Sequence, residues 1–181
     1  MRSVPFLFFL KNHGKKGILD DFSGLLIKIP LISTLAFRSD DYFINLKSIK
    51  VDGKVVSFDT SLLSIDSGAV GGAKISTFTP YAVLHSAIYN ALAKDFAKRA
   101  FDKKMIGLAP LAPFGARFNT KNVATTKNAG PAVPTMDLEL RGIGNSSSNT
   151  YWRICGANSM ARIKRNVMCL GFLDGGPNPV T

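Results

Sequence analysis

The chain is poor in the residues that usually build metal sites, and it has no long apolar run. Among its 181 residues are two cysteines and two histidines, without any Cys-x-x-Cys spacing. Because zinc ligands come in such clusters, we expect no metal ion and no cofactor. A membrane-spanning helix needs roughly 18 consecutive apolar residues. The sequence contains no such run, so we expect no insertion into a membrane.

Acidic residues are also scarce, with 12 Asp and Glu against 23 Lys and Arg, which gives a formal charge of +11. Nucleic-acid binders use Lys and Arg to contact phosphates. Here the basic residues are scattered as singles and pairs, such as Lys15-Lys16 and Lys98-Arg99, without a zinc finger or an RNP-like motif. We therefore expect no nucleic-acid partner. A positive surface equally suits an acidic polysaccharide or an acidic protein.

The first 40 residues have no steady hydrophobic period. Residues 1–10 begin with a positive charge followed by a short apolar run. That run is at the minimum for the core of a signal peptide, and no clear cleavage site follows it. Residues 25–31 form the most regular stretch and are predicted to be a strand. Residues 1–40 are thus interpreted as a poorly defined segment, a signal remnant plus one strand.

A β-hairpin is predicted directly after this segment. Residues 42–51 are rich in aromatic and β-branched side chains, and Asp52-Gly53 separates them from residues 54–56. An Asp-Gly pair between apolar runs is a strong hairpin signal, because the primed turn needs positive φ at both central residues. The apolar alternation shifts phase near Ser48, which predicts a bulge in the first strand.

One amphipathic helix follows, and short strands dominate the rest. Apolar residues recur at steps of three and four from position 84 to position 96, which predicts a helix over residues 80–100. Thr79 and Pro80 precede it in the order expected for an N-cap and a first helical residue. Residues 137–141, 151–154 and 166–172 are predicted strands. The fold class is therefore mainly β with one main helix.

Several segments resemble, in the correct order, the plant group of extracellular dermal glycoproteins and basic 7S globulins. This group includes xylanase inhibitors and xyloglucan-endoglucanase inhibitors. The segments are residues 42–44, 46–51, 62–66, 71–77, 112–115, 130–134, 152–154, 156–160, 169–172 and 174–176. The resemblance begins near Leu31 and implies a pepsin-like fold, of which residues 41–181 would be a partial C-terminal lobe. Relatives continue beyond Thr181 into further apolar strands, so the lobe is expected to be incomplete at its C-terminus.

One candidate catalytic residue follows from the chemistry of aspartic peptidases. They use two carboxylates, one from each lobe, which share a proton and activate water. The usual signature is an apolar pair, then Asp, Thr or Ser, Gly, and a further Thr or Ser. Asp66 heads the match Asp-Ser-Gly, but Ala69 stands at the position of the supporting hydroxyl. We interpret Asp66 as a solvated loop carboxylate, with catalysis as the alternative.

The resemblance supplies a different register for the catalytic position. Active relatives typically read Gly-Gly-Thr, two apolar residues, then Asp-Ser-Gly-Thr. Residues 71–79 occupy that frame, so Ser76 stands where the aspartate would be and Phe78 replaces the turn glycine. A serine cannot serve as the acid–base carboxylate, and a bulky residue resists the positive φ of that turn. The resemblance therefore implies a non-catalytic protein whose vestigial position is Ser76.

The cysteines also depart from the pattern of the group. Relatives carry a cysteine after the Ala-Pro-Phe-Gly motif, paired with the cysteine that corresponds to Cys169. Arg117 occupies its position here, so the resemblance implies that Cys169 has lost its partner. Two alternatives remain open for Cys155 and Cys169. They form a bridge in an oxidising compartment, or both are buried free thiols.

These observations lead to a functional hypothesis that rests on the resemblance. We expect a secreted, non-catalytic binding protein of the apoplast or cell wall that inhibits a xylanase or xyloglucanase, or binds a peptide. An aspartic endopeptidase that uses Asp66 is the first alternative, and a storage-globulin-like remnant is the second. Lys103, Lys104 and Arg117 are the candidate binding residues. Asn145 begins an Asn-Ser-Ser sequon and is the candidate glycosylation site.

Overall fold

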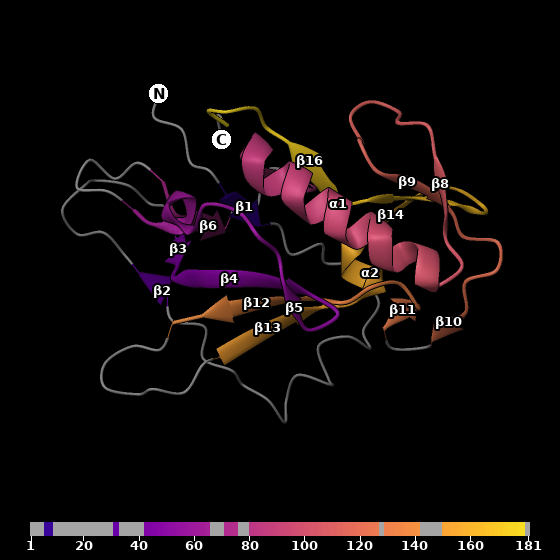
Figure 1. Ribbon diagram of the computed structural model, residues 1–181, viewed down its shortest axis with the longest axis horizontal. Helices are drawn as coiled ribbons and strands as arrows, with labels where there is room; N and C mark the ends of the chain where they lie inside the picture. The colour runs from indigo at the N-terminus through magenta and orange to yellow at the C-terminus, as the bar shows by residue number, and fades with distance from the viewer. Residues whose placement is uncertain are drawn as a thin grey trace.

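The structure is a computed structural model, and it describes residues 6–8, 31–32, 42–65, 71–75, 80–126, 129–141 and 150–179. Within these residues, two α-helices lie among mostly short strands (Figure 1). The helices are α1 (Ser86–Asp102) and α2 (Gly156–Ser159), with a 3-10 turn over Thr60–Leu63. The strands are β1 (Phe6–Phe8), β2 (Leu31–Ile32), β3 (Tyr42–Ile44), β4 (Leu46–Val51), β5 (Lys54–Val55), β6 (Ala73–Ile75), β7 (Ala82–Leu84), β8 (Ile106–Leu108), β9 (Arg117–Asn119), β10 (Thr125–Thr126), β11 (Gly130–Pro131), β12 (Met136–Leu140), β13 (Thr150–Ile154), β14 (Met160–Lys164), β15 (Val167–Leu170) and β16 (Phe172–Asp174).

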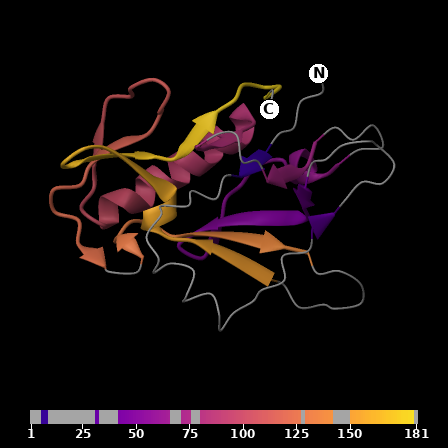
Figure 2. The same cartoon turned by 180° about the vertical axis from the view of Figure 1, so that it is seen from behind.

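Within the described residues the strands form four sheets. One sheet has six strands in the order β16-β7-β1-β6-β3-β2. Two sheets have four strands each, in the orders β13-β12-β4-β5 and β14-β15-β9-β8, and β10 pairs with β11. Seen from behind, the two orange strands β12 and β13 run beside the purple β4, and α1 lies over the sheet that these strands form (Figure 2). The prediction of a mainly β fold with one main helix is confirmed.

The predicted hairpin is confirmed, and the strand before it divides between two sheets. Asp52 and Gly53 both have positive φ, at 46° and 78°, and Val51 pairs with Lys54 across the turn. The predicted bulge near Ser48 is present, because the pairing with β12 skips Lys47. The single strand predicted over residues 42–51 is wrong. It breaks into β3 and β4, which belong to different sheets.

The predicted beginning of the helix is wrong. Thr79 lies outside the described residues, and Pro80 precedes a strand instead of opening the helix. That strand, β7, buries Ala82 and Leu84 and pairs with β1 and β16, and this tertiary pairing prevails over the local helical pattern. The helix starts at Ser86, where the Nδ1 atom of His85 accepts a hydrogen bond of 3.1 Å from the backbone N–H of Ala87. Its end at Asp102 agrees with the prediction.

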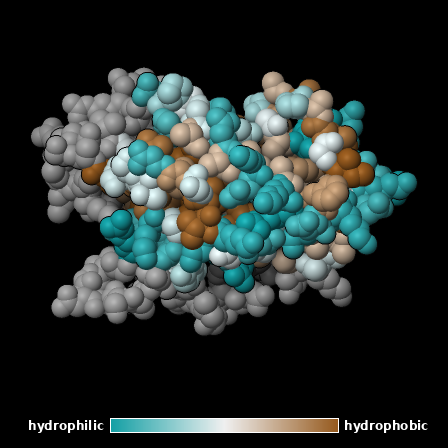
Figure 3. All heavy atoms as spheres, viewed as in Figure 1, coloured by the Kyte–Doolittle hydropathy of each residue, from teal (hydrophilic) through white to brown (hydrophobic). Residues whose placement is uncertain are grey.

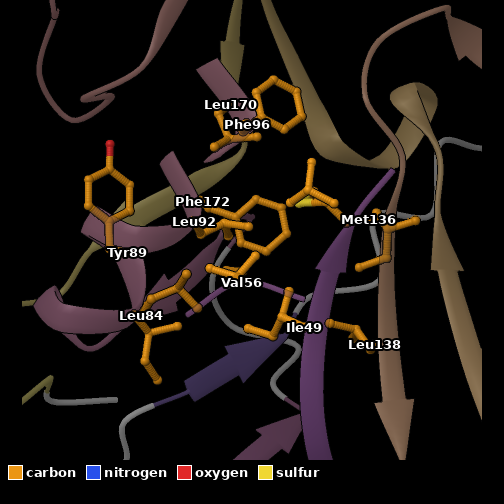
Figure 4. Close-up of a cluster of buried hydrophobic side chains, with 14 of the residues drawn as sticks. Ile49, Val56, Leu84, Tyr89, Leu92, Phe96, Met136, Leu138, Leu170 and Phe172 are labelled. Atoms are coloured by element: carbon orange, nitrogen blue, oxygen red, sulfur yellow. The ribbon is translucent and has the colours of Figure 1, made fainter. Parts of the chain in front are cut away.

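The core lies between α1 and the sheet that contains β4 and β12 (Figure 4). Leu92 and Phe96 project from α1 toward Ile49 of β4 and Leu138 of β12, and all four side chains are fully buried. Phe96 also packs against Phe118 of β9, with ring centroids 5.7 Å apart. The helix therefore links the four-stranded sheets, and its C-terminal end lies close to β8.

Candidate functional site

The two candidate catalytic positions follow immediately on described residues. Asp66 begins the stretch 66–70, whose flanking residues Ile65 and Gly71 form an antiparallel bridge. Ser76 follows Ile75, the last residue of β6. Asp66 and Ser76 themselves lie outside the described residues, so both assignments remain predictions.

The backbone before β6 supports the Gly-Gly part of the register. Gly71 and Gly72 have φ values of 95° and 78°, in the region that favours glycine. A Cβ atom at Gly71 would lie 2.3 Å from the carbonyl oxygen of Ser64, and one at Gly72 would lie 2.3 Å from the side chain of Ile65. Both positions therefore require glycine. Gly71 bridges to Ile65, and Gly72 directly precedes β6.

β6 also carries a residue that is unusual for a buried strand. Lys74 is only 7% exposed, and its neighbours across the ladders are Leu7 of β1 and Phe43 of β3. Lysine is seldom buried unless it is paired. In the register that the resemblance implies, which stays a prediction, Lys74 would stand two residues before Ser76, where an apolar residue is expected.

The two cysteines are free thiols, and one of them faces Arg117. Cys155 is half-buried and Cys169 is fully buried. Burial raises the pKa of the Cys169 thiol, while the nearby Arg117 acts in the opposite direction. Cys169 of β15 lies directly across from Arg117 of β9 in the antiparallel ladder. This placement agrees with the view that Arg117 stands at the position of the missing cysteine.

Two of the three candidate binding residues are engaged within the chain. The Nζ atom of Lys103 lies 3.6 Å from a carboxylate oxygen of Asp52. The other oxygen of Asp52 accepts a hydrogen bond of 2.9 Å from the backbone N–H of Thr135. Arg117 donates a hydrogen bond of 3.0 Å from Nη1 to the carbonyl of Ala109. These contacts give Lys103 and Arg117 structural roles.

The third candidate, Lys104, lies on an exposed turn between apolar side chains. Its φ of 62° places it in the left-handed region where the chain leaves α1. Lys104 is exposed and makes no ion pair with the described part of the chain. Phe101, at the end of α1, is 79% exposed, and Ile106, at the start of β8, is 59% exposed. We call these three residues the α1–β8 surface.

The surroundings of this surface combine apolar and hydrophilic groups. Figure 3 shows hydrophobic side chains gathered at the end of the molecule where Figure 1 places β8 and β9, with hydrophilic side chains around them. β8 is also an edge strand of its sheet. Sequence reasoning missed Phe101 and Ile106 as candidate binding residues. Phe101 does not lie on the apolar face of α1 to which Leu92 and Phe96 belong. An aromatic residue off this face was the sequence signal for an exposed side chain.

Among the described residues, the carboxyl group with the largest pKa shift lies on the sheet β13-β12-β4-β5, away from the α1–β8 surface. Glu139 of β12 accepts hydrogen bonds of 2.8 Å from Lys47 and 2.7 Å from Ser48, and Lys50 lies 3.1 Å from its second oxygen. These contacts, led by that with Lys47, lower the pKa of Glu139 to about 2. The same face holds Asp137, which binds Arg153 through two hydrogen bonds. A carboxylate held by three donors stays ionised, so it suits stability better than proton transfer.

Other classes of site find no support in the described ranges. No three His, Cys, Asp or Glu side chains come together there as a metal-ligand set. None of the described helices is long and apolar enough to cross a membrane. The sequon at Asn145 falls in the stretch 142–149, outside the described residues, and stays a prediction.

Comparisons with known proteins agree with these features. The family described as xylanase inhibitor C-terminal matches residues 41–181. A probable aspartic proteinase, GIP2, from Nicotiana benthamiana is 47% identical over 167 residues, which are 90% of this chain and 36% of that protein. Gamma conglutin 1 from Prunus dulcis is 40% identical over 142 residues, which are 78% of this chain and 30% of that protein.

Solved structures give the same result. The crystal structure of EDGP superposes with a TM-score of 0.72 at 43% identity, covering 83% of this chain and 37% of that one. Basic 7S globulin from soybean gives a TM-score of 0.60 at 28% identity, covering 83% of this chain and 33% of that one. The chain thus spans about a third of the length of the relatives it matches. This chain belongs to the xylanase inhibitor C-terminal family of pepsin-like aspartic protease homologues.

Proposed function

We propose that this chain is a secreted, non-catalytic binding protein that inhibits a cell-wall-degrading glycoside hydrolase of the xylanase or xyloglucanase type. It would act in the apoplast or cell wall as part of plant defence. The observation that carries the proposal is the α1–β8 surface, an exposed lysine between two exposed apolar side chains at one end of the molecule. The family description, xylanase inhibitor C-terminal, points to the same class of partner.

The chemistry of the partner fits this surface. Glycoside hydrolases hold two carboxyl groups on either side of the scissile bond, so their clefts are acidic. A positive protein of charge +11 is attracted to such a cleft, and a lysine at the tip of a turn can reach into it. Phe101 and Ile106 would add apolar contact around the ion pair, as exposed aromatic and aliphatic anchors do at other interfaces.

We expect Lys104→Glu to weaken inhibition at least about tenfold, because like charges facing each other across an interface cost several kcal/mol. The measurement is residual activity of a panel of endoxylanases and xyloglucanases titrated with the protein at mildly acidic pH. Lys94→Glu is the matched control, because it reverses an exposed charge in the middle of α1. The control should inhibit as the natural protein does. A folded natural protein that inhibits no panel member would contradict the proposal for those enzymes.

An aspartic endopeptidase is the second candidate, because one relative is named as a probable aspartic proteinase. We expect no pepstatin-sensitive peptidase activity, since Ser76 would replace the aspartate of this lobe. Any residual hydrolysis should be identical in Asp66→Asn, measured with a fluorogenic peptide in mild acid. Pepstatin-sensitive cleavage that disappears in Asp66→Asn would instead establish the enzyme.

The third candidate is a storage protein, because other relatives are named basic 7S globulin and gamma conglutin. A storage role needs no defined interface, so it is favoured if the protein unfolds cooperatively yet inhibits nothing. Cooperative unfolding together with saturable, salt-sensitive inhibition favours the inhibitor.

A further inference from the structure

One sheet of the molecule has no acidic residue of its own. The strands of the sheet β14-β15-β9-β8 lie within residues 104–135 and 141–173, and neither stretch contains Asp or Glu. The acidic residues between the two stretches, Asp137 and Glu139, lie on another sheet, where they bind basic partners. The positive charge of the sheet β14-β15-β9-β8 is therefore not neutralised by its own side chains.

The strand register places basic and uncharged side chains in one row across this sheet. Lys164 at the end of β14 pairs with Val167 of β15, which in turn pairs with Asn119 of β9. Asn119 pairs with Ile106 of β8. Residues directly opposite each other lie on the same face of a sheet. Neighbouring strands are about 4.8 Å apart, so the row is about 14 Å long.

The turn between β14 and β15 adds a further cation and holds another beside it. Arg165 lies in this turn, and its carbonyl accepts a hydrogen bond of 2.9 Å from Nη1 of Arg162. The next carbonyl, that of Asn166, accepts a hydrogen bond of 2.9 Å from the backbone N–H of Thr120. Lys121 directly follows Thr120, so it lies close to the turn. Two hydrogen bonds thus fix the turn next to the end of β9.

The cations at this end of the sheet are available to a ligand. Lys121, Lys164 and Arg165 are exposed, and none of them makes an ion pair with the described part of the chain. Asn119 accepts a hydrogen bond of 3.0 Å at Oδ1 from the backbone N–H of Lys121, and its amide N–H groups make none with described residues. We call these four residues and the half-buried Val167 the basic strip. Figure 3 shows hydrophilic side chains at the end of the molecule where Figure 1 places β14 and the turn after it.

The composition of the basic strip favours a sugar polymer over other polyanions. Single-stranded nucleic acids are bound by basic grooves with aromatic side chains on which the bases stack, and the strip has no aromatic residue. Interfaces with folded proteins are centred most often on Trp, Tyr and Arg, of which the strip has only Arg165. An aliphatic side chain, an amide donor and a set of cations match the C–H groups, the hydroxyls and the carboxylates of an acidic sugar.

We propose that the basic strip binds a linear polyuronide, an acidic polysaccharide with a carboxylate on each sugar. Arg165 and the two lysines pair with carboxylates along the polymer, and the amide of Asn119 donates to a sugar oxygen. The choice of a sugar polymer rests on the proposed location in the cell wall, whereas the site does not depend on the proposed inhibition. Binding holds the protein on the wall and leaves Lys104 free to face a glycoside hydrolase.

The test measures the binding of a fluorescent galacturonate oligomer by fluorescence anisotropy at several salt concentrations. Its methyl ester is the uncharged counterpart, and polyglutamate and single-stranded DNA of equal charge represent the other polyanions. The strip variant combines Lys121→Gln, Lys164→Gln and Arg165→Gln. The control variant combines three exposed replacements elsewhere, again of two lysines and one arginine: Lys94→Gln, Lys98→Gln and Arg141→Gln. Melting temperatures establish that all three proteins are folded.

We expect the strip variant to bind the oligomer roughly tenfold more weakly than the natural protein, because three exposed ion pairs are lost. The control variant should bind as the natural protein does, and added salt should weaken binding because it screens exposed charges. Unchanged binding by the strip variant, an equal loss in the control variant, or equally tight binding of the methyl ester, polyglutamate or DNA would each overturn the proposal. The assay contains no hydrolase, and the strip variant keeps Lys104, so failure of this proposal and failure of the proposed inhibition are seen separately.

Discussion

Replacing Arg117 by cysteine is expected to create a disulfide bond with Cys169 and to raise the free energy of unfolding by about 4 kcal/mol. The bond would close a loop of about 50 residues, because 169 − 117 is 52. Cross-linking removes conformational entropy from the unfolded chain, and a loop of this length corresponds to about 4 kcal/mol in the chain-entropy treatment. For a chain of this size the melting temperature should rise by roughly 10 °C.

The hydrogen-bond pattern shows that the two positions can be bridged. Leu170 donates to the carbonyl of Ala116 at 3.0 Å, and Thr120 donates to that of Asn166 at 2.9 Å. Antiparallel ladders alternate hydrogen-bonded and non-hydrogen-bonded pairs, so the pair between position 117 and Cys169 is a non-hydrogen-bonded one. In such pairs the Cα atoms lie about 4.5 Å apart, within the range that disulfides tolerate.

The measurement is urea unfolding of Arg117→Cys with and without a reducing agent, together with a thiol count. Arg117→Ser is the matched control, because it also removes the guanidinium and its hydrogen bond to Ala109 but cannot form the bridge. The gain should vanish on reduction and be absent in the control. If oxidised Arg117→Cys retains a reactive thiol at Cys169 and unfolds like Arg117→Ser, the register between β9 and β15 is wrong.

Local signals and the resemblance together predicted part of this architecture. The Asp52-Gly53 hairpin follows from two residues that accept positive φ, so no distant contact was needed. The beginning of α1 was misjudged because β7 is stabilised by partners far along the chain, β1 and β16. β1 itself is three residues long, too short for its alternation to distinguish a strand from a signal-peptide core.

The candidate site was also predicted only in part, because some of its residues are recognisable from sequence motifs and others depend on tertiary packing. The opposition of Arg117 and Cys169 came from matching a family motif, and the register confirms it. Phe101 could have been found from its place outside the apolar stripe of the helix, whereas the exposure of Ile106 depends on how β8 packs, which the sequence pattern does not contain. The sequence does not distinguish Lys103 from Lys104 as a binding residue, because the ion pair of Lys103 with Asp52 depends on the fold. The roles of Asp66 and Ser76 stay predictions.

The second large effect concerns Glu139, whose replacement by glutamine should lower the free energy of unfolding by about 3 kcal/mol at pH 7. The side chain of Glu139 is only 7% exposed and receives donors from Lys47, Ser48 and Lys50. These contacts, the one with Lys47 first, lower its pKa from 4.5 to about 2. The difference between the two pKa values corresponds to about 3 kcal/mol of preference for the ionised form in the folded protein.

The contribution of Glu139 to the free energy of unfolding decreases as the pH falls. Because the folded-state pKa lies below the unfolded value, the unfolded chain binds the proton first as the pH falls. The contribution of Glu139 is complete above about pH 4.5 and is lost as the pH falls toward about 2. The stability difference between the natural protein and Glu139→Gln should therefore be constant through mildly acidic pH and then shrink.

Urea unfolding of both proteins at a series of pH values from 7 to 2 measures this difference directly. Asp102→Asn is the control, because it removes an exposed carboxylate at the end of α1 and should change stability by less than about 0.5 kcal/mol. A Glu139→Gln deficit that did not depend on pH would show that packing or hydrogen-bond geometry, and not the charge, causes it. A deficit that shrinks only in strong acid would mean that this face of the β4–β12 sheet keeps its ion pairs in the mildly acidic surroundings proposed for the protein.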